Sequence, residues 1–248
     1  MNIPRPFLAS LIAGFVLLPP LPGNAAVILY DTPAADTYVY DGQPGNNFGT
    51  AINLVTRYTA NNTAMRLTYI RFDLDGLLTE TVESASLSIT FQSLSNANGT
   101  SATISVYGLN HSYVPPTGKL GLDWGETELT NENAPWAASG SSTVPGIVTL
   151  LGTFEVPVTP PPSGGTVYSI STPELAAFLE TYRANNEDNV TFILRSNTST
   201  LFNFASKENP TYGPSTLSVT TVPEPNACLL SGLGLALLLR RNSRPSRE

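Results

Sequence analysis

Residues 85–91 read Ala-Ser-Leu-Ser-Ile-Thr-Phe, a strict alternation of apolar and polar side chains. Successive side chains of a strand point to opposite faces, so the apolar residues share one face and the hydroxyl residues the other. The apolar face consists of Ala85, Leu87, Ile89 and Phe91. A strand with one apolar face must bury that face against another layer of structure. The stretch therefore predicts a sheet that is covered on one side.

Similar segments recur through the middle of the chain. It is rich in Thr, Val, Ile, Tyr and Phe, broken by Gly, Pro and Asn, and these residue types favour strands and turns. Further strands are predicted at residues 27–30, 36–41, 67–74, 103–107, 148–151, 153–156, 190–194, 202–205 and 217–220. No boundary between two domains is visible among these segments.

One helix is predicted after residue 170. Residues 171–174 read Ser-Thr-Pro-Glu, which has the spacing of a capping box with Pro in the first turn. Apolar residues then recur at i, i+3, i+4 and i+7, and Asn185-Asn186 closes the pattern. This stripe consists of Leu175, Phe178, Leu179 and Tyr182. Together the segments predict an all-β fold, an antiparallel sandwich of two sheets with one short helix.

Residues 1–25 have the anatomy of a secretory signal peptide. Arg5 precedes an apolar stretch at residues 7–18, three prolines follow, and small residues at Gly23 and Ala25 suit cleavage after Ala25. A buried N-terminal helix is the alternative, but the prolines at 19, 20 and 22 would end a helix there. We therefore expect a signal helix that signal peptidase removes, and an exported protein.

The body between the two terminal segments is acidic. Without residues 1–25 and 222–248, the chain keeps 7 Lys and Arg against 17 Asp and Glu, a net charge near −10 compared with −7 for the whole chain. Such a body repels polyphosphate, which argues against nucleic acid as a partner. It also disfavours a uronic-acid polymer unless the few arginines cluster. The single cysteine, Cys228, lies in the C-terminal segment, so the body has no disulfide.

The C-terminal segment has three elements in order. Residues 222–225 read Val-Pro-Glu-Pro, residues 227–239 are rich in Leu and Gly, and a basic tail occupies residues 240–248. Residues 226–239 form an uncharged run of 14 residues, whereas a helix that spans a bilayer needs roughly 20. We therefore expect a C-terminal hydrophobic helix that acts as a transient stop in the inner membrane, with the arginines on the cytoplasmic side.

These three elements resemble the PEP-CTERM sorting signal of Gram-negative bacteria that produce exopolysaccharide. The residues that carry the resemblance are Val222, Pro223, Glu224, Pro225, Arg240 and Arg241. The resemblance covers residues 222–248 and implies an exosortase as partner, a membrane cysteine transpeptidase that cuts near Pro-Glu-Pro and passes the protein outward. It implies a destination at the cell surface or in the biofilm matrix, and it says nothing about what the body does there.

The body, residues 26–221, resembles the DNRLRE domain, a jelly-roll family related to carbohydrate-binding modules. The matching pieces lie in family order at residues 36–39, 47–49, 69–74, 82–87, 104–107, 124–126, 129–135, 204–208 and 217–219. Two positions depart from the family: Asn131 stands where a Trp is usual, and Ser206-Lys-Glu replaces Ser-Arg-Glu. The resemblance implies a jelly-roll-like sandwich that binds carbohydrate, and the lost Trp weakens sugar stacking at residue 131.

Sugar binding usually needs an exposed aromatic ring and planar polar groups beside it. Aromatic residues in loop-like, polar contexts and arginines on or near strands supply the candidates. The predicted carbohydrate-binding residues are Trp124, Trp136, Tyr58, Arg57 and Arg66. The alternative for Trp124 is a plug that closes one end of the sandwich.

A structural Ca²⁺ ion is a second expectation. Asp36, Asp41 and Asn47 lie near a glycine-rich loop with many carbonyl oxygens, and oxygen atoms are the ligands that Ca²⁺ prefers. The alternative is that these side chains cap local turns of the backbone.

Catalysis has little support in the sequence. The one histidine, His111, follows a predicted strand in a loop, and without a body Cys or a second His neither a thiol protease nor a His-rich zinc site can form. Acids near Trp124 keep a polysaccharide hydrolase open as an alternative: Asp123, Glu126, Glu128 and Glu132. We predict a secreted, non-catalytic protein that binds extracellular polysaccharide. The other alternative is a structural or adhesive surface protein without a sugar pocket.

Overall fold

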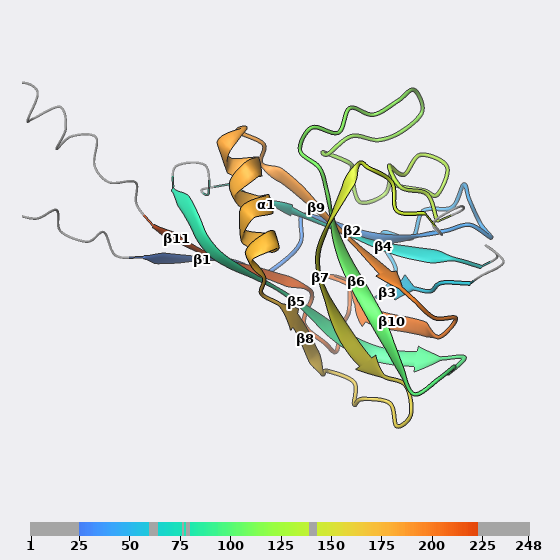
Figure 1. Ribbon diagram of the computed structural model, residues 1–248. Helices are drawn as coiled ribbons and strands as arrows, with labels where there is room; N and C mark the ends of the chain where they lie inside the picture. The colour runs from blue at the N-terminus through green and yellow to red at the C-terminus, as the bar shows by residue number, and fades with distance from the viewer. Residues whose placement is uncertain (1–24, 60–63, 76, 78–79, 139–142, 223–248) are drawn as a thin grey trace, which may run out of the picture. The chain divides into compact units, whose positions relative to one another are not determined.

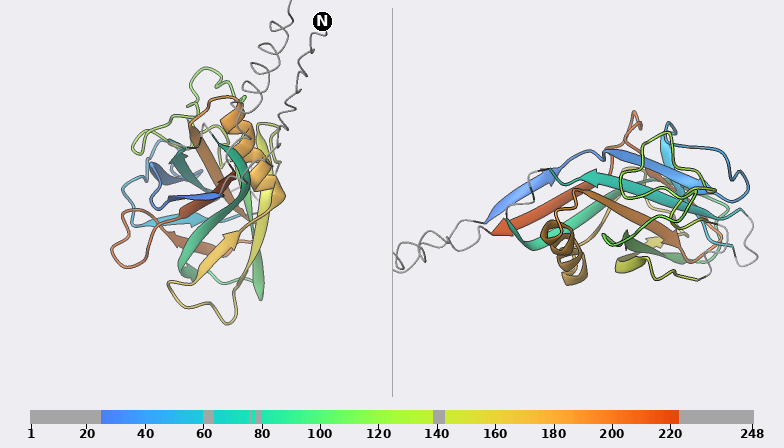
Figure 2. Two further views of the ribbon diagram at one scale, coloured as in Figure 1. Left: turned by 90° about the vertical axis from the view of Figure 1, so that its left-hand side faces the viewer. Right: turned by 90° about the horizontal axis from the view of Figure 1, so that it is seen from above.

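The computed structural model contains two antiparallel sheets (Figures 1 and 2). The first sheet has the order β1 (Ala26–Tyr30), β11 (Thr216–Val222), β5 (Thr81–Ser95), β10 (Leu201–Ala205) and β3 (Asn53–Thr56), and β8 (Val167–Ile170) also pairs with β5. The second sheet has the order β2 (Ala35–Tyr40), β4 (Arg66–Asp73), β9 (Asn189–Ser196), β6 (Ser101–Leu109) and β7 (Val148–Pro157). The predicted all-β fold of two antiparallel sheets and one short helix is confirmed.

The structure describes residues 25–59, 64–75, 77, 80–138 and 143–222. They belong to one compact unit, Asn24–Glu224. The predicted signal helix, the C-terminal hydrophobic helix and residues 223–248 of the sorting segment lie outside the described residues. Within the described part of the chain, no helix is long and apolar enough to cross a membrane.

The main core lies between the two sheets, and β5 shows how the alternating sequence builds it. Ala85, Leu87, Ile89 and Phe91 are all at most 4% exposed, as the sequence predicts. The second sheet contributes Ile70 to the same core. The body has no disulfide that could stabilise it. The folded state is therefore stabilised mainly by the burial of large apolar side chains between the sheets.

A second core lies on the other face of the second sheet. The connection between β6 and β7 is long, and we call its described part at residues 110–138 the cover segment. Its side chains pack against Leu67 and Tyr69, which point away from the main core and are fully buried. Both alternating faces of β4 are therefore buried, and the molecule has a third layer on this side.

The helix α1 (Pro173–Ala184) packs against β5 and β7. Its four stripe residues are buried as predicted: Leu175, Phe178, Leu179 and Tyr182. The predicted capping box does not form, because Thr172 is the N-cap, accepts a hydrogen bond from Leu175 N at 3.1 Å, and so has Leu175 instead of Glu174 at the third helical position. Ser171 instead donates to the carbonyl of Ala85 at 2.9 Å and ties the start of the helix to β5.

Candidate carbohydrate-binding face

The cover segment buries both tryptophans against the second sheet. Trp124 is 1% exposed, and its ring meets Tyr69 edge to face with 6.1 Å between centroids. Trp136 is 5% exposed and packs edge to face on Tyr107 at 5.2 Å. Rings this deeply buried have no free face on which a sugar could stack. The structure thus places both predicted sugar contacts in the second core, between the cover segment and the second sheet.

Arg57 and Arg66 lie side by side where the chain passes from β3 to β4. They form an antiparallel bridge in which each backbone N–H donates to the other's carbonyl at 3.0 Å. Arg66 is also the register partner of Tyr40 in β2. Directly opposed residues of antiparallel strands point to the same face, so Tyr40, Arg66 and Arg57 form a row across adjacent strands.

The Arg66 guanidinium lies over the ring of Tyr40, 3.9 Å from its centroid. This distance allows a cation–π interaction. Burial lowers the pKa of Arg66, but a guanidinium stays charged in proteins. The ring of Tyr40 packs directly against Gly42. A Cβ atom added at Gly42 would come within 2.4 Å of this ring, so the ring can adopt its position only because residue 42 has no side chain.

A stacked aromatic pair continues this row. Tyr38 points to the same face of β2 as Tyr40, and its ring stacks on Phe48 with 4.3 Å between centroids and 14° between planes. Burial raises the pKa of Tyr38 and the charge of Arg66 lowers it, which places Arg66 near both tyrosines. We call these half-buried residues the tyrosine–arginine face: Tyr38, Tyr40, Phe48, Arg57 and Arg66.

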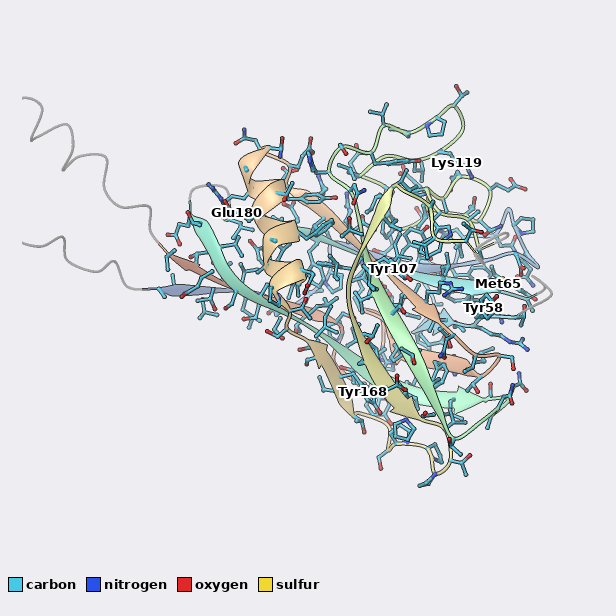
Figure 3. The ribbon with its side chains drawn as sticks, viewed as in Figure 1. Tyr58, Met65, Tyr107, Lys119, Tyr168 and Glu180 are labelled. Carbon is cyan, nitrogen blue, oxygen red and sulfur yellow. The ribbon has the colours of Figure 1, made fainter. Side chains whose placement is uncertain are left out.

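Tyr58 lies at the same end of the sandwich. Its backbone N–H donates to the carbonyl of Thr198 at 2.9 Å, and the guanidinium of Arg195 lies 4.7 Å from the centroid of its ring. Figure 3 shows Tyr58 at one end of the molecule and Glu180 of α1 at the other. Arg57 and Arg66 thus lie together on one face of the second sheet, whereas Arg195 and Tyr58 lie on the opposite face with the second core.

The three predicted calcium ligands do not form one site. Asn47 caps a local turn, because its Oδ1 accepts from Gly49 N at 2.9 Å and its Nδ2 donates to the carbonyls of Glu126 and Leu129 at 3.0 and 2.8 Å. The carboxyl of Asp41 lies near Arg66. Burial raises the pKa of Asp41, and the positive charge of Arg66 offsets this rise only in part. Only Asp36 lies among other acids, and these come from outside the predicted set.

The acids around Trp124 organise the cover segment. Glu126 forms an ion pair with Lys207, and Glu128 Oε2 accepts from the backbone N–H of Gly125 at 2.9 Å. His111 borders a shallow hollow of about 440 Å³ beside α1, and its ring meets Tyr182 edge to face at 6.1 Å. Glu126 and Glu128 thus each contact a group of the protein itself.

The edge of this β-sandwich thus offers half-buried aromatic rings and planar, charged arginines side by side, the kinds of group that can bind a sugar. The chain belongs to carbohydrate-binding module family 96, whose sequence model matches residues 28–160. This is a family of binding modules, typically without catalytic activity, and no catalytic domain was found in the chain. No curated protein matches the chain.

The family match ends soon after β7, but the sandwich does not. β9 lies between β4 and β6, and β11 lies between β1 and β5. Removal of the residues beyond 160 would therefore open gaps inside both sheets. All residues of the tyrosine–arginine face lie within the matched part, whereas Arg195 belongs to β9 beyond it.

Proposed function

We propose that this protein is exported and binds polysaccharide on the tyrosine–arginine face. The observation that carries the proposal is the row of Tyr40, Arg66 and Arg57, with the Arg66 guanidinium 3.9 Å from the Tyr40 ring centroid. Aromatic rings offer a flat apolar surface to a sugar ring. A guanidinium is a planar donor that matches a carboxylate with two parallel hydrogen bonds.

These groups favour a polysaccharide with acidic substituents. An acidic body repels such a chain, and only a local excess of positive charge can offset the repulsion. Arg57 and Arg66, which lie side by side with only Asp41 among the described residues as an acid near Arg66, provide that excess. We therefore propose an anionic extracellular polysaccharide as the ligand, bound in an extended form along the row of side chains.

The terminal segments support export as part of the same proposal. β1 begins at Ala26 and β11 ends at Val222, and these two strands pair with Ala26 opposite Thr221. Cleavage after Ala25 by signal peptidase and near Pro223 by an exosortase would leave this strand pair whole. The protein would reach the cell surface or the biofilm matrix of a Gram-negative bacterium after transient anchoring in the inner membrane.

Strand order supports a jelly-roll-like topology for the module. β1, β11, β5 and β8 lie next to one another in one sheet, and β4, β9, β6 and β7 in the other. Alternation of early and late strands within both sheets is typical of the doubled Greek key of jelly rolls.

Affinity electrophoresis of the full chain in gels that contain acidic or neutral polysaccharides tests the proposal. We expect retardation by an acidic polymer, and a loss of affinity of about tenfold or more in Arg66→Ala and Tyr40→Ala. Arg183→Ala is the matched control, because Arg183 lies in α1 and ion-pairs with Glu180 at the far end. Far-UV circular dichroism checks that each variant is folded.

The alternatives give different results in the same assay. A structural or adhesive protein would show no retardation in any polysaccharide gel. A hydrolase would release reducing sugar from a polymer that it binds, and Glu126→Gln would abolish the release. Equal retardation of the wild type, Arg66→Ala and Arg183→Ala would refute the assignment of binding to this face.

A further inference from the structure

Three carboxylates from distant parts of the sequence meet at one edge of the sandwich. Asp36 lies in β2, Glu126 in the cover segment, and Glu208 follows β10. One carboxylate oxygen of each lies within 4.8 Å of the other two. None of the three acids belongs to the tyrosine–arginine face, although Asp36 lies on the same face of β2 as Tyr38 and Tyr40. Of the three, the sequence analysis predicted only Asp36 as a calcium ligand.

The acids are not fully satisfied by the protein. Asp36 is fully buried; its Oδ2 accepts a hydrogen bond from Lys207 N at 2.9 Å, while its Oδ1 has no hydrogen-bond partner among the described residues. Oε2 of Glu208 is likewise buried without such a partner in the described part of the chain. Buried carboxylate oxygens without a donor are strongly unfavourable, so each of them requires an explanation.

The charges in the cluster do not balance. The ammonium of Lys207 pairs with Glu126 and also donates to the carbonyl of Ala34 at 3.1 Å. One positive charge thus faces three carboxylates, which leaves an excess of two negative charges when all three are ionised. A divalent cation would cancel this excess and would supply the missing partner for the free oxygens.

We propose that Asp36, Glu126 and Glu208 bind a Ca²⁺ ion. Ca²⁺ binds oxygen ligands at about 2.3–2.6 Å, so two ligands of one ion are at most about 5 Å apart, and the carboxylate oxygens of this cluster, all within 4.8 Å of one another, can bind the same ion. Mg²⁺ binds at about 2.0–2.1 Å and requires a tighter octahedron. Mg²⁺ also loses its bound water reluctantly, so a site whose ligands all come from the protein favours Ca²⁺.

The bound ion joins three segments that the sheets alone do not hold together. It would fix the cover segment and the turn after β10 to the edge strand β2, and so would stabilise the third layer. Without the ion, burial raises the pKa of Asp36, and the negative charges of Glu208 and Glu126 raise it further. A proton on Asp36 would then cancel part of the excess negative charge. Burial and the charge of Glu126 raise the pKa of Glu208 in the same way.

The test is thermal unfolding and calorimetric titration of the full chain after treatment with EDTA and dialysis. We expect one Ca²⁺ bound per chain, and a rise in Tm of about 5–10 °C at a Ca²⁺ concentration about 100-fold above Kd. Mg²⁺ should give a smaller rise. Asp36→Asn and Glu208→Gln should each weaken Ca²⁺ binding by about tenfold or more.

The matched control is Asp75→Asn. Asp73, Asp75 and Asp188 form a second group of acids whose carboxylate oxygens also lie within 4.8 Å of one another, but Asp73 and Asp75 are exposed. Ca²⁺ binding should survive in Asp75→Asn. No Ca²⁺ binding by the wild type, or binding that survives in Glu208→Gln and is lost in Asp75→Asn, would overturn the proposal. Because Glu208 is partly exposed, Glu208→Gln keeps the test decisive even if Asp36→Asn fails to fold.

Discussion

The indole Nε1 of Trp124 donates a hydrogen bond to Thr191 Oγ1 at 2.9 Å, and both residues are buried. Thr191 lies in β9, which is flanked by β4 and β6 in the second sheet. The guanidinium of Arg71 lies 5.8 Å from the same indole ring. Trp124 thus fixes the cover segment to the sheet, with its polar edge satisfied and its apolar body in the second core.

Replacement of Trp124 by Ala should lower the free energy of unfolding by about 3–5 kcal/mol, because it leaves a large cavity and an unpaired Thr191 hydroxyl. Urea denaturation measures the change. Val114→Ala is the control, since Val114 is 82% exposed in the same segment and its loss should change stability by less than about 0.5 kcal/mol. Unchanged stability with lost sugar binding in Trp124→Ala would restore the stacking role for this residue.

A second prediction concerns Gly49, which lies against the backbone of the cover segment. An added Cβ at Gly49 would come within 2.0 Å of the carbonyl oxygen of Glu126, and neither backbone can yield easily. Gly49→Ala should therefore lower the free energy of unfolding by about 1–3 kcal/mol. Gly146→Ala is the control, because nothing lies within 4 Å of its added Cβ. Equal stability of the two variants in urea would contradict the close contact.

Most strands of the sandwich can be predicted from the sequence, because apolar and polar residues alternate along them. β5 and α1 were found because their apolar residues repeat with the strand and helix periods over many residues. β3 and β8 are not among the predicted strands; both are short, and β3 is buried at three consecutive positions and so does not alternate. Residues 148–151 and 153–156 were predicted as two strands but form one, β7, which continues through Gly152 with a shift in its register to β6.

The candidate site was harder to predict than the fold. Alternation places Tyr38 and Tyr40 on one face of β2, but the stacking of Phe48 on Tyr38 depends on a loop. The polar neighbours of Trp124 in the sequence suggest exposure, whereas Thr191, which buries it, is 67 residues away. Such contacts arise only in the tertiary structure, and they cannot be predicted from the pattern of neighbouring residues in the sequence.

A third prediction tests the position of the Tyr40 ring. Gly42→Ala places a Cβ where the ring now lies, so the ring must move away from the Arg66 guanidinium. Affinity for the acidic polysaccharide should fall by about threefold to tenfold, equivalent to about 1 kcal/mol, because one ring is displaced and no charge is lost. Affinity electrophoresis measures it, with Gly213→Ala as the control for a glycine without near neighbours. Full affinity in Gly42→Ala would exclude Tyr40 from the binding face.

The last prediction concerns pH in the presence of a chelator. Burial, with the charges of Glu208 and Glu126, raises the pKa of Asp36 from 3.8 to about 7, while the backbone N–H and charge of Lys207 oppose the shift. Between these two values the folded chain binds more protons than the unfolded chain, so its free energy of unfolding must fall as pH rises and level off above about pH 7. Glu180 has a lowered pKa and acts in the opposite direction, but only at more acidic pH.

Urea denaturation in EDTA from about pH 5 to 8 should therefore show stability decreasing with pH, and Asp36→Asn should flatten this slope. Glu208 adds a smaller part of the slope, because burial and Glu126 raise its pKa as well. Asp75→Asn should keep the wild-type slope, since Asp75 lies in the exposed acidic group. A slope that is the same in Asp36→Asn as in the wild type would show that another group titrates, and that Asp36 is charged in the folded protein throughout this range.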